Sequence, residues 1–337
     1  MDTKRLSIEA VVRKAIRDVQ DDPRRGLRNL IDMGESFAKG RFQKPFLQRI
    51  QTMLEKEDSA YYTLLIRTLE NTDITSIYDF GINIGYNSCT KGAKLIRELE
   101  EKHHFNIPWS LSLEINEHYL AQGTLYPRIL EQGMELGIFT YLLYLNKCDP
   151  ALLLPLVKRC PDCAFVVLVR EREPEDTLLS LMACGNVLIS AYDDEHGQQI
   201  CQFLQTHRFP CAMHLRYGKA DIPRILNDSW VRHAVAAAPL FAFLSPSPDV
   251  EEKDQLRVYD HLRQTREQQR YPLLLLDLKH DQLTIDRIIS DDECIVGFDE
   301  EGWLITHRLR AIGNEDLNIL HHDLISILDH EQNRYGQ

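Results

Sequence analysis

Cys160 and Cys163 are the two residues whose types and spacing come nearest to a chemical motif, because Cys-x2-Cys is the spacing of half a zinc site or of a redox pair. A structural zinc ion takes four ligands, and no second pair with this spacing occurs among the cysteines of the chain. A single pair beside an apolar segment is more typical of buried packing, since free cysteine behaves as a small apolar residue. We therefore predict that both cysteines lie in the core and hold no metal.

Polar residues that follow apolar segments form a second group of candidates. They are Glu114, Asn116, His118, Asn146, Asp149, Arg170, His214, Arg216, Asp277 and Lys279. In an α/β barrel the active site lies at the carboxyl ends of the strands, and these residues stand at or just beyond such ends in the predicted fold. Glu117 and His118 could act as an acid–base pair, although a polar surface loop has the same composition. We predict a pocket at the barrel mouth and assign no catalytic residue.

The apolar pattern around the first of these residues predicts two consecutive β-α units. Ser110–Ile115 alternates like a strand, and apolar residues recur at helical spacing from Leu120 to Leu136. Gly137 falls where this helix ends, because glycine adopts the left-handed conformation without steric cost. Ile138–Leu145 is a nearly continuous apolar run, which is typical of a strand buried on both faces of a parallel sheet. Repeated units of this kind indicate an α/β barrel or a doubly wound sheet.

Strands and helices continue to alternate along the chain. We predict further strands at Ala164–Val169, Val187–Ala191, Ala212–Arg216, Leu240–Leu244 and Leu273–Leu278. We predict intervening helices at Leu152–Val157, Thr177–Ala183, Gln198–Gln205 and Glu251–Gln269. Near the end, Cys294–Thr306 has two apolar runs around an acidic turn and predicts a hairpin, and Leu317–Leu328 predicts a last helix.

The segment before the first strand is predicted to be mainly helical. Apolar residues recur at helical spacing through residues 1–70, which indicates a helical bundle that packs against the barrel. Phe80–Thr90 carries glycines and asparagines just before the predicted helix Ala93–Leu99. Such a turn can bind an anion, but this one lacks the lysine and serine of a P-loop. We predict a connecting segment ahead of the barrel with no anion site.

Three short patterns in this chain resemble those of the radical S-adenosylmethionine (radical SAM) enzymes, and in particular a bacterial subgroup of them. Asn106-Ile107-Pro108-Trp109 precedes the first predicted strand, Ile129–Gly137 ends in Q-G-M-E-L-G, and Cys160–Phe165 is C-P-D-C-A-F. The resemblance extends from about Pro23 to about Thr306 and is carried by Ser59–Val169. It implies an α/β fold, a partial TIM-like (β/α) barrel of the radical SAM type with an N-terminal α-helical bundle.

The sequence departs from that family where the family's chemistry resides. The resemblance implies a [4Fe-4S] cluster on cysteines spaced C-x3-C-x2-C after the first strand, and a G-G-E-P-type motif for S-adenosylmethionine after the second. Here no cysteine lies between Cys89 and Cys148, and residues 146–150 are Asn-Lys-Cys-Asp-Pro. We therefore expect neither cofactor. A cluster on Cys148, Cys160, Cys163 and Cys294 is a weaker alternative, because these cysteines are scattered over separate elements.

The composition narrows the classes of partner. A net charge of −12 disfavours nucleic acid, which calls for a basic surface, and suits a basic peptide or protein. No apolar run reaches the roughly 18 residues that a membrane span needs, and the first residues lack the apolar core of a secretion signal. The irregular spacing of the 8 cysteines does not suggest a disulfide framework. We expect a cytoplasmic protein with no membrane partner.

These patterns together predict three regions and one function. The regions are an N-terminal helical region at 1–105, a radical SAM-like partial barrel at 106–290, and a C-terminal hairpin and helix at 291–337. The expected function is that of a non-catalytic radical SAM-like protein that binds a peptide, a small molecule or a protein partner, with regulation of an intact radical SAM enzyme as one role. The alternative is an enzyme with cluster-independent chemistry at the barrel mouth, such as metal-assisted hydrolysis or proton transfer.

Overall fold

The computed structural model describes residues 58–335, apart from positions 74, 172, 291 and 292, together with scattered positions between 14 and 56. These residues form two compact units. The β1–β4 unit holds residues 75–192 and 279–335, and the β5–β7 unit holds residues 193–278 and the described residues before 74. Most of the predicted helical bundle at residues 1–70 lies outside the described residues, so that bundle and the three predicted regions stay predictions.

Parallel strands form the centre of the β1–β4 unit. They are β1 (Ser110–Glu114), β2 (Thr140–Leu145), β3 (Ala164–Val169) and β4 (Val187–Tyr192), paired in chain order. All residues of β3 are buried, because helices cover both faces of the parallel sheet. On the free side of β1 lies β8 (Val296–Phe298), which is parallel to β1, and β9 (Leu304–Thr306) pairs antiparallel with β8. The predicted α/β class and the predicted hairpin are both confirmed.

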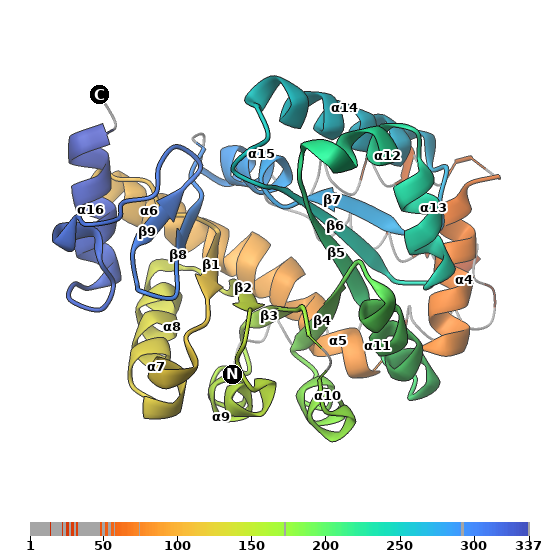
Figure 1. The fold of residues 1–337 in the computed structure, drawn as a ribbon, viewed down its shortest axis with the longest axis horizontal. Coiled ribbons are helices and arrows are strands. Elements are labelled where there is room, and N and C mark those ends of the chain that lie inside the picture. The colour runs from red at the N-terminus through yellow and green to blue at the C-terminus, as the bar shows by residue number, and fades with distance from the viewer. Residues whose placement is uncertain are drawn as a thin grey trace. The chain divides into compact units, whose positions relative to one another are not determined.

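Short helices connect these strands along one side of the sheet (Figure 1). They are α7 (Glu117–Gln122), α8 (Leu125–Leu136), the 3-10 turn η2 (Pro150–Leu153), α9 (Leu154–Arg159) and α10 (Glu175–Met182). As predicted, α8 ends at Gly137, whose φ is 93°. This alternation of strand and helix, with consecutive strands as neighbours, is the order of an α/β barrel, whereas a doubly wound sheet reverses its strand order.

A long helical segment crosses the amino ends of these strands and forms the connection ahead of β1. Phe80–Thr90 is helical throughout, because α5 (Thr75–Ile82), the π-helix η1 (Asn83–Gly92) and α6 (Ala93–His103) follow one another without a break. The asparagines of this stretch serve packing, as does Gly92 just after it. Gly92 lies against the backbone of Gly137, where any side chain would collide.

Buried asparagines hold the C-P-D-C turn that precedes β3. Asn83 Nδ2 donates to the carbonyl oxygens of Pro161 at 2.8 Å and Cys163 at 2.9 Å, and Asn87 Nδ2 donates to that of Asp162 at 2.8 Å. The carbonyl of Cys160 accepts from Asn186 at 3.0 Å. Both cysteine side chains are buried, as predicted. Every carbonyl of this turn is therefore paired within the core.

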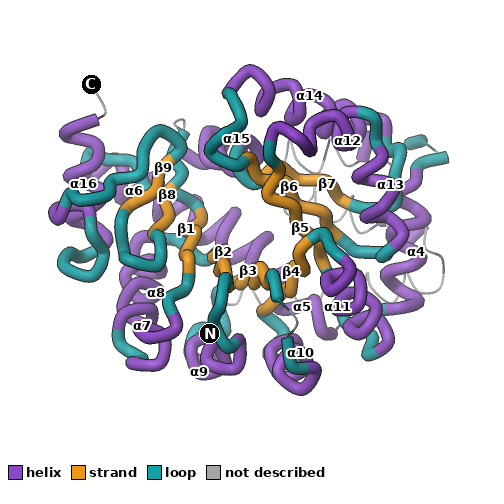
Figure 2. The backbone as a smooth tube through the Cα atoms, in the orientation of Figure 1, coloured by secondary structure: helices purple, strands orange, loops and turns teal. Residues whose placement is uncertain are grey.

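The β5–β7 unit contains the parallel strands β5 (Ala212–Tyr217), β6 (Phe241–Pro246) and β7 (Leu274–Asp277), paired in chain order. Helices surround these strands in Figure 2. They are α4 (Ala60–Asn71), α11 (Glu195–Thr206), α12 (Ile222–Leu226), α13 (Ser229–Ala236) and α14 (Glu252–Gln268), with a 3-10 turn η3 (Lys219–Asp221). The strands and helices predicted in this part of the chain are confirmed to within about three residues at each end.

The C-terminal part belongs to the β1–β4 unit, and its last helix begins later than predicted. After α15 (His280–Ser290) and the hairpin come a 3-10 turn η4 (Glu315–Leu317) and α16 (Leu324–Tyr335), not a helix from Leu317. Residues after η4 instead pack on the hairpin, where Asn318 bridges to Trp303. Gln132 of α8 accepts from the Leu324 N–H at 2.8 Å, and so caps α16. No helix in the described part of the chain is long and apolar enough to cross a membrane.

The close approach of Gly92 to Gly137 predicts an unequal pair of glycine variants. Gly92→Ala places a methyl group against the carbonyl oxygens of Gly137 and Asn87, so we expect a loss of about 1–3 kcal/mol of unfolding free energy. Gly85→Ala, in the same helical segment, meets no atom within 4 Å and should be neutral or stabilising by up to about 1 kcal/mol. Urea denaturation of both variants measures the difference. Equal stability of the two variants would contradict the role assigned to Gly92.

Candidate functional site

The connections after β1 and β2 are short and capped by side chains. Only Ile115 and Asn116 separate β1 from α7, and Asn116 Oδ1 accepts from the His118 N–H at 3.0 Å, which caps that helix. After β2, Asp149 Oδ1 accepts from the Ala151 N–H at 2.9 Å and caps η2. Two of the sequence candidates, Asn116 and Asp149, therefore shape the backbone at the carboxyl edge of the sheet.

Carboxylates from four connections gather at this edge. Asn146, after β2, donates to Glu300 Oε1 in the β8–β9 turn at 2.8 Å. The Asp149 N–H donates to Glu117 Oε2 at 3.2 Å, which joins the connection after β2 to α7. Because β8 lies beside β1, the acidic hairpin turn reaches residues about 150 positions earlier in the sequence. We refer to this group, formed by Glu114, Glu117, Asp149, Glu173 and Glu300, as the acidic edge.

An ion pair fixes the hairpin next to Glu114. The Asp299 side chain is 3% exposed and accepts from the N–H groups of Glu301 and Trp303 at 3.0 and 2.8 Å. Its other oxygen accepts from Arg310 Nε and Nη2 at 3.1 and 2.8 Å. These hydrogen bonds with Asp299 raise the pKa of Arg310. Arg310 lies 3.9 Å from Glu114, but its charge is already balanced by Asp299.

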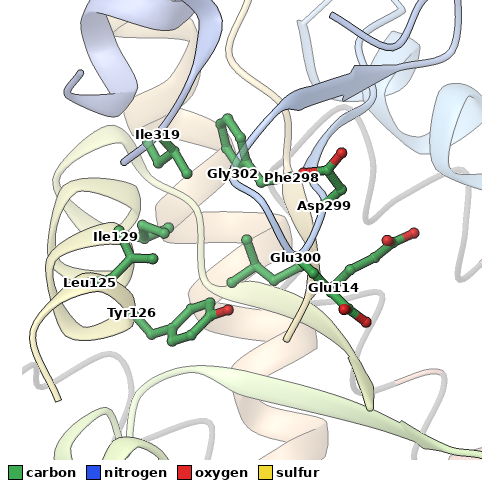
Figure 3. Close-up of a pocket in the computed structure, with 10 residues that line it drawn as sticks. Glu114, Leu125, Tyr126, Ile129, Phe298, Asp299, Glu300, Gly302 and Ile319 are labelled. Atoms are coloured by element: carbon green, nitrogen blue, oxygen red, sulfur yellow. The ribbon is translucent and has the colours of Figure 1, made fainter. Parts of the chain in front are cut away.

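A shallow pocket opens between this hairpin and α8. It has a volume of about 220 Å³ including its open mouth, and its enclosed part holds about one water molecule. Figure 3 shows the carboxylates of Glu114, Asp299 and Glu300 on one side and the apolar side chains of α8 on the other. The Tyr126 hydroxyl accepts from the Asn116 N–H at 2.8 Å, and burial raises the pKa of Tyr126 to about 12. The pocket is thus apolar on one wall and acidic on the other.

Burial and mutual repulsion perturb two further groups at the acidic edge. The pKa of Glu173 is raised to about 7, mainly by burial and to a smaller extent by the charges of Asp149 and Glu171. The pKa of Cys148 is raised to about 12, mainly by burial and to a smaller extent by the negative charges of Glu117 and Asp149. Glu173 therefore exchanges a proton near neutral pH, whereas Cys148 stays a thiol there.

The other sequence candidates have partners outside the acidic edge as defined here or belong to the other unit. The exposed His118 contacts Gln122 Nε2 at 2.9 Å, and Arg170 lies over the Tyr192 ring at 4.9 Å. His214 is buried in β5, Arg216 is exposed in β5, and Asp277 is buried at the end of β7; all three belong to the β5–β7 unit. Lys279 begins the segment that leads into α15.

Sequence reasoning missed several polar groups. Asp299 and Glu300 belong to the predicted hairpin, whose acidic turn was the available signal, and Arg310 follows that hairpin. In the β5–β7 unit, the buried Asp193 accepts from Arg224 at 3.1 Å, from the indole of Trp230 at 3.0 Å and from His233 at 3.1 Å. No motif marks these residues, because their positions are separated by tens of residues.

The cysteines of the chain do not fit a [4Fe-4S] cluster at this edge. Three thiolates are needed there, but the connection after β1 contains none, and Cys148 lies among carboxylates that disfavour its thiolate. Cys160 and Cys163 belong to the turn at the opposite ends of the strands. Among the described residues, no group of three or more histidine, cysteine or acidic side chains could hold a metal ion.

Comparison with known proteins finds weak structural similarity only at the level of solved structures. No protein-family model matches the chain, and no curated protein matches it. Among solved structures, a phosphoribosyl anthranilate isomerase from Thermus thermophilus matches with a TM-score of 0.26 and 13% identity, over 50% of this chain and 86% of that one. A similarity at this level supports no inference about function.

The raised pKa of Glu173 predicts a pH dependence of stability. Because the folded state holds this proton more tightly than the unfolded state, the stabilisation is complete below the ordinary value of 4.5 and is lost as pH rises through about 7. Glu173→Gln should flatten the decline in unfolding free energy between these values. Glu135→Gln, on the exposed side of α8, should leave it unchanged. Denaturation at a series of pH values tests this, and identical profiles for wild type and Glu173→Gln would contradict it.

Proposed function

We propose that this protein is a non-catalytic relative of the radical SAM enzymes, with a partial barrel of that type, and that its acidic pocket binds a protonated amine of a peptide or protein partner. The observation that carries the proposal is the pocket between α8 and the hairpin, where Glu114 and Glu300 face an apolar wall. A lysine side chain has the matching chemistry, because its methylenes pack on apolar surface while its ammonium stays with polar groups.

Size and charge both support an ammonium ligand. The enclosed space suits a group of about the size of one water molecule, which an ammonium is and a guanidinium is not. The acidic edge brings carboxylates from several connections together. An ammonium donates three hydrogen bonds, and carboxylates are the acceptors that interact with it most strongly. The net charge of −12 also favours a basic partner.

The roles of the family-like motifs support a shared fold rather than shared chemistry. The Trp109 N–H donates to Asp286 at 3.1 Å and its indole to the Gln282 carbonyl at 3.2 Å, at the amino end of β1. Gly137 and Cys163 likewise stand at amino ends of strands. In barrels that end contributes to stability, and the carboxyl end carries the chemistry.

A second function, cluster-independent proton transfer, is favoured by Glu173. A carboxyl group with a pKa near 7 suits a general acid or base at neutral pH. Asp149, which contributes to this shift, lies at the same edge. This alternative makes Glu173 the catalytic residue, whereas amine binding depends on Glu114 and Glu300.

Amine binding is testable with a matched pair of ligands. N-acetyl-lysine-N-methylamide should bind, and the norleucine analogue, which keeps the methylenes but lacks the ammonium, should bind at least about tenfold more weakly. Glu114→Gln and Glu300→Gln should each weaken lysine binding by about tenfold, because each removes a charge-assisted hydrogen bond. Titration calorimetry at low and high salt measures both effects. Glu135→Gln is the control, and equal binding of the two ligands would contradict the proposal.

The expected lack of both cofactors has its own test. Native mass spectrometry of protein purified without oxygen should give the mass of the bare chain, with or without added S-adenosylmethionine. Iron and sulfide in the purified protein, or retention of S-adenosylmethionine, would instead identify an enzyme.

A further inference from the structure

A thiol and a half-buried guanidinium line one pocket in the β5–β7 unit. Cys211, just before β5, and Arg67, in α4, both line this pocket, whose volume is about 320 Å³ including its open mouth. Its enclosed part holds about two water molecules. Phe209 and Leu240 supply apolar walls.

Arg67 is fixed in place without a carboxylate partner. Its Nη2 donates to the carbonyl oxygens of Pro239 at 2.8 Å and Pro272 at 2.9 Å. It forms no ion pair with any carboxylate in the described part of the chain, and burial lowers the pKa of Arg67. The Cys211 thiol lies close enough that a negative charge on its sulfur would stabilise the charged guanidinium of Arg67. A thiolate at Cys211 would therefore be the counter-ion that this arginine lacks.

Two further groups favour reaction at Cys211. Gln205 Nε2, oriented by the carbonyl oxygens of Ala237 and Ala238 at 2.8 and 3.0 Å, donates to Cys211 Sγ at 3.4 Å. The Cys201 thiol interacts with that of Cys211, and also donates to the carbonyl of Ala212 at 3.7 Å. The Cys211 thiol and burial raise the pKa of Cys201 well above its ordinary value, so Cys201 stays protonated beside it.

We propose that Cys211 is a site of oxidation by hydrogen peroxide, with Cys201 as the resolving thiol. The electropositive, solvent-connected surroundings of Cys211 are those of a reactive cysteine, and the pocket is small enough to select a small uncharged peroxide. The product is a disulfide between Cys201, in α11, and Cys211, in the connection that follows α11.

The chemistry balances with the peroxide as the oxidant. The Cys211 thiolate attacks one peroxide oxygen, an S–O bond forms, the O–O bond breaks, and the leaving hydroxide takes up the proton released by the thiol. The Cys201 sulfur then attacks the Cys211 sulfenic acid, an S–S bond forms, and the S–O bond breaks to release water with the Cys201 proton. Two thiols are oxidised to a disulfide and one peroxide is reduced to two waters.

The chain offers a matched control pair. Cys160 and Cys163 are 2% and 0% exposed, as against 0% and 2% for Cys201 and Cys211, and their thiols also interact. The thiol of Cys163, followed by Arg159, lowers the pKa of Cys160. Burial and contact between thiols are thus common to both pairs, but the Gln205 donor and the pocket with its fixed arginine belong to Cys211.

The test is a hydrogen peroxide titration of the full chain, followed by alkylation of free thiols and peptide mapping by mass spectrometry. We expect the Cys201–Cys211 disulfide to form before any product at Cys160, Cys163, or the more exposed Cys184 and Cys294. Cumene hydroperoxide, which is too large for the pocket, should react much more slowly. Earlier oxidation of any other cysteine, or equal rates with the two peroxides, would overturn the proposal.

Variants separate the roles of the groups. Cys201→Ser should trap a sulfenic acid on Cys211 that dimedone labels, and Cys211→Ser should leave Cys201 unlabelled. Arg67→Met should slow oxidation, because it removes the cation that lines the pocket with Cys211, whereas Arg67→Lys should retain most of the rate. Arg232→Met, on the exposed surface of α13, is the control. If Arg67→Met does not fold, the serine variants alone decide, and a lack of labelling in Cys201→Ser refutes the proposal.

Discussion

The β1–β4 unit depends on pairing the backbone polar groups at the amino ends of its strands. Parallel strands buried on both faces begin inside the protein, so the turns before them need hydrogen-bond partners other than water. Asn83 and Asn87 supply these partners to the C-P-D-C turn. They can reach that turn because Gly92 lets the same helical segment approach the end of α8 at Gly137. The π-helical form of η1 accompanies this close contact.

This constraint explains why the motifs that resemble the radical SAM family say little about chemistry. The residues of these motifs have structural partners. Trp109 donates to Asp286, and Gln132 caps α16. Gly137 packs on Gly92, and the Cys163 carbonyl accepts from Asn83. A sequence can keep these residues while the connections at the other ends of the strands change. The two-residue connection from β1 to α7, capped by Asn116, lies at those other ends. The fold therefore depends on packing at the amino ends of the strands, whereas the acidic edge depends on the connections at their carboxyl ends.

Electrostatics divides that edge into a balanced part and an unbalanced part. Asp299 and Arg310 satisfy each other and hold the β8–β9 hairpin rigid. The remaining carboxylates lie close enough that Asp149 and Glu171 add to the effect of burial on Glu173. Carboxylates in this arrangement favour either a bound cation or a shared proton. These two outcomes correspond to the proposed amine binding and to its alternative.

The sequence by itself determined the local elements and their order. Uninterrupted apolar runs such as Ala164–Val169 require burial on both faces, and Gly137 ends α8 because of its backbone freedom, so both could be predicted from neighbours in the chain. The tertiary structure alone decided the sites. Asn146 meets Glu300, and Arg67 meets Cys211, through strand pairing and helix packing between residues far apart in sequence. Periodicity reports which residues are buried, but which distant side chains meet follows only from how the elements pack.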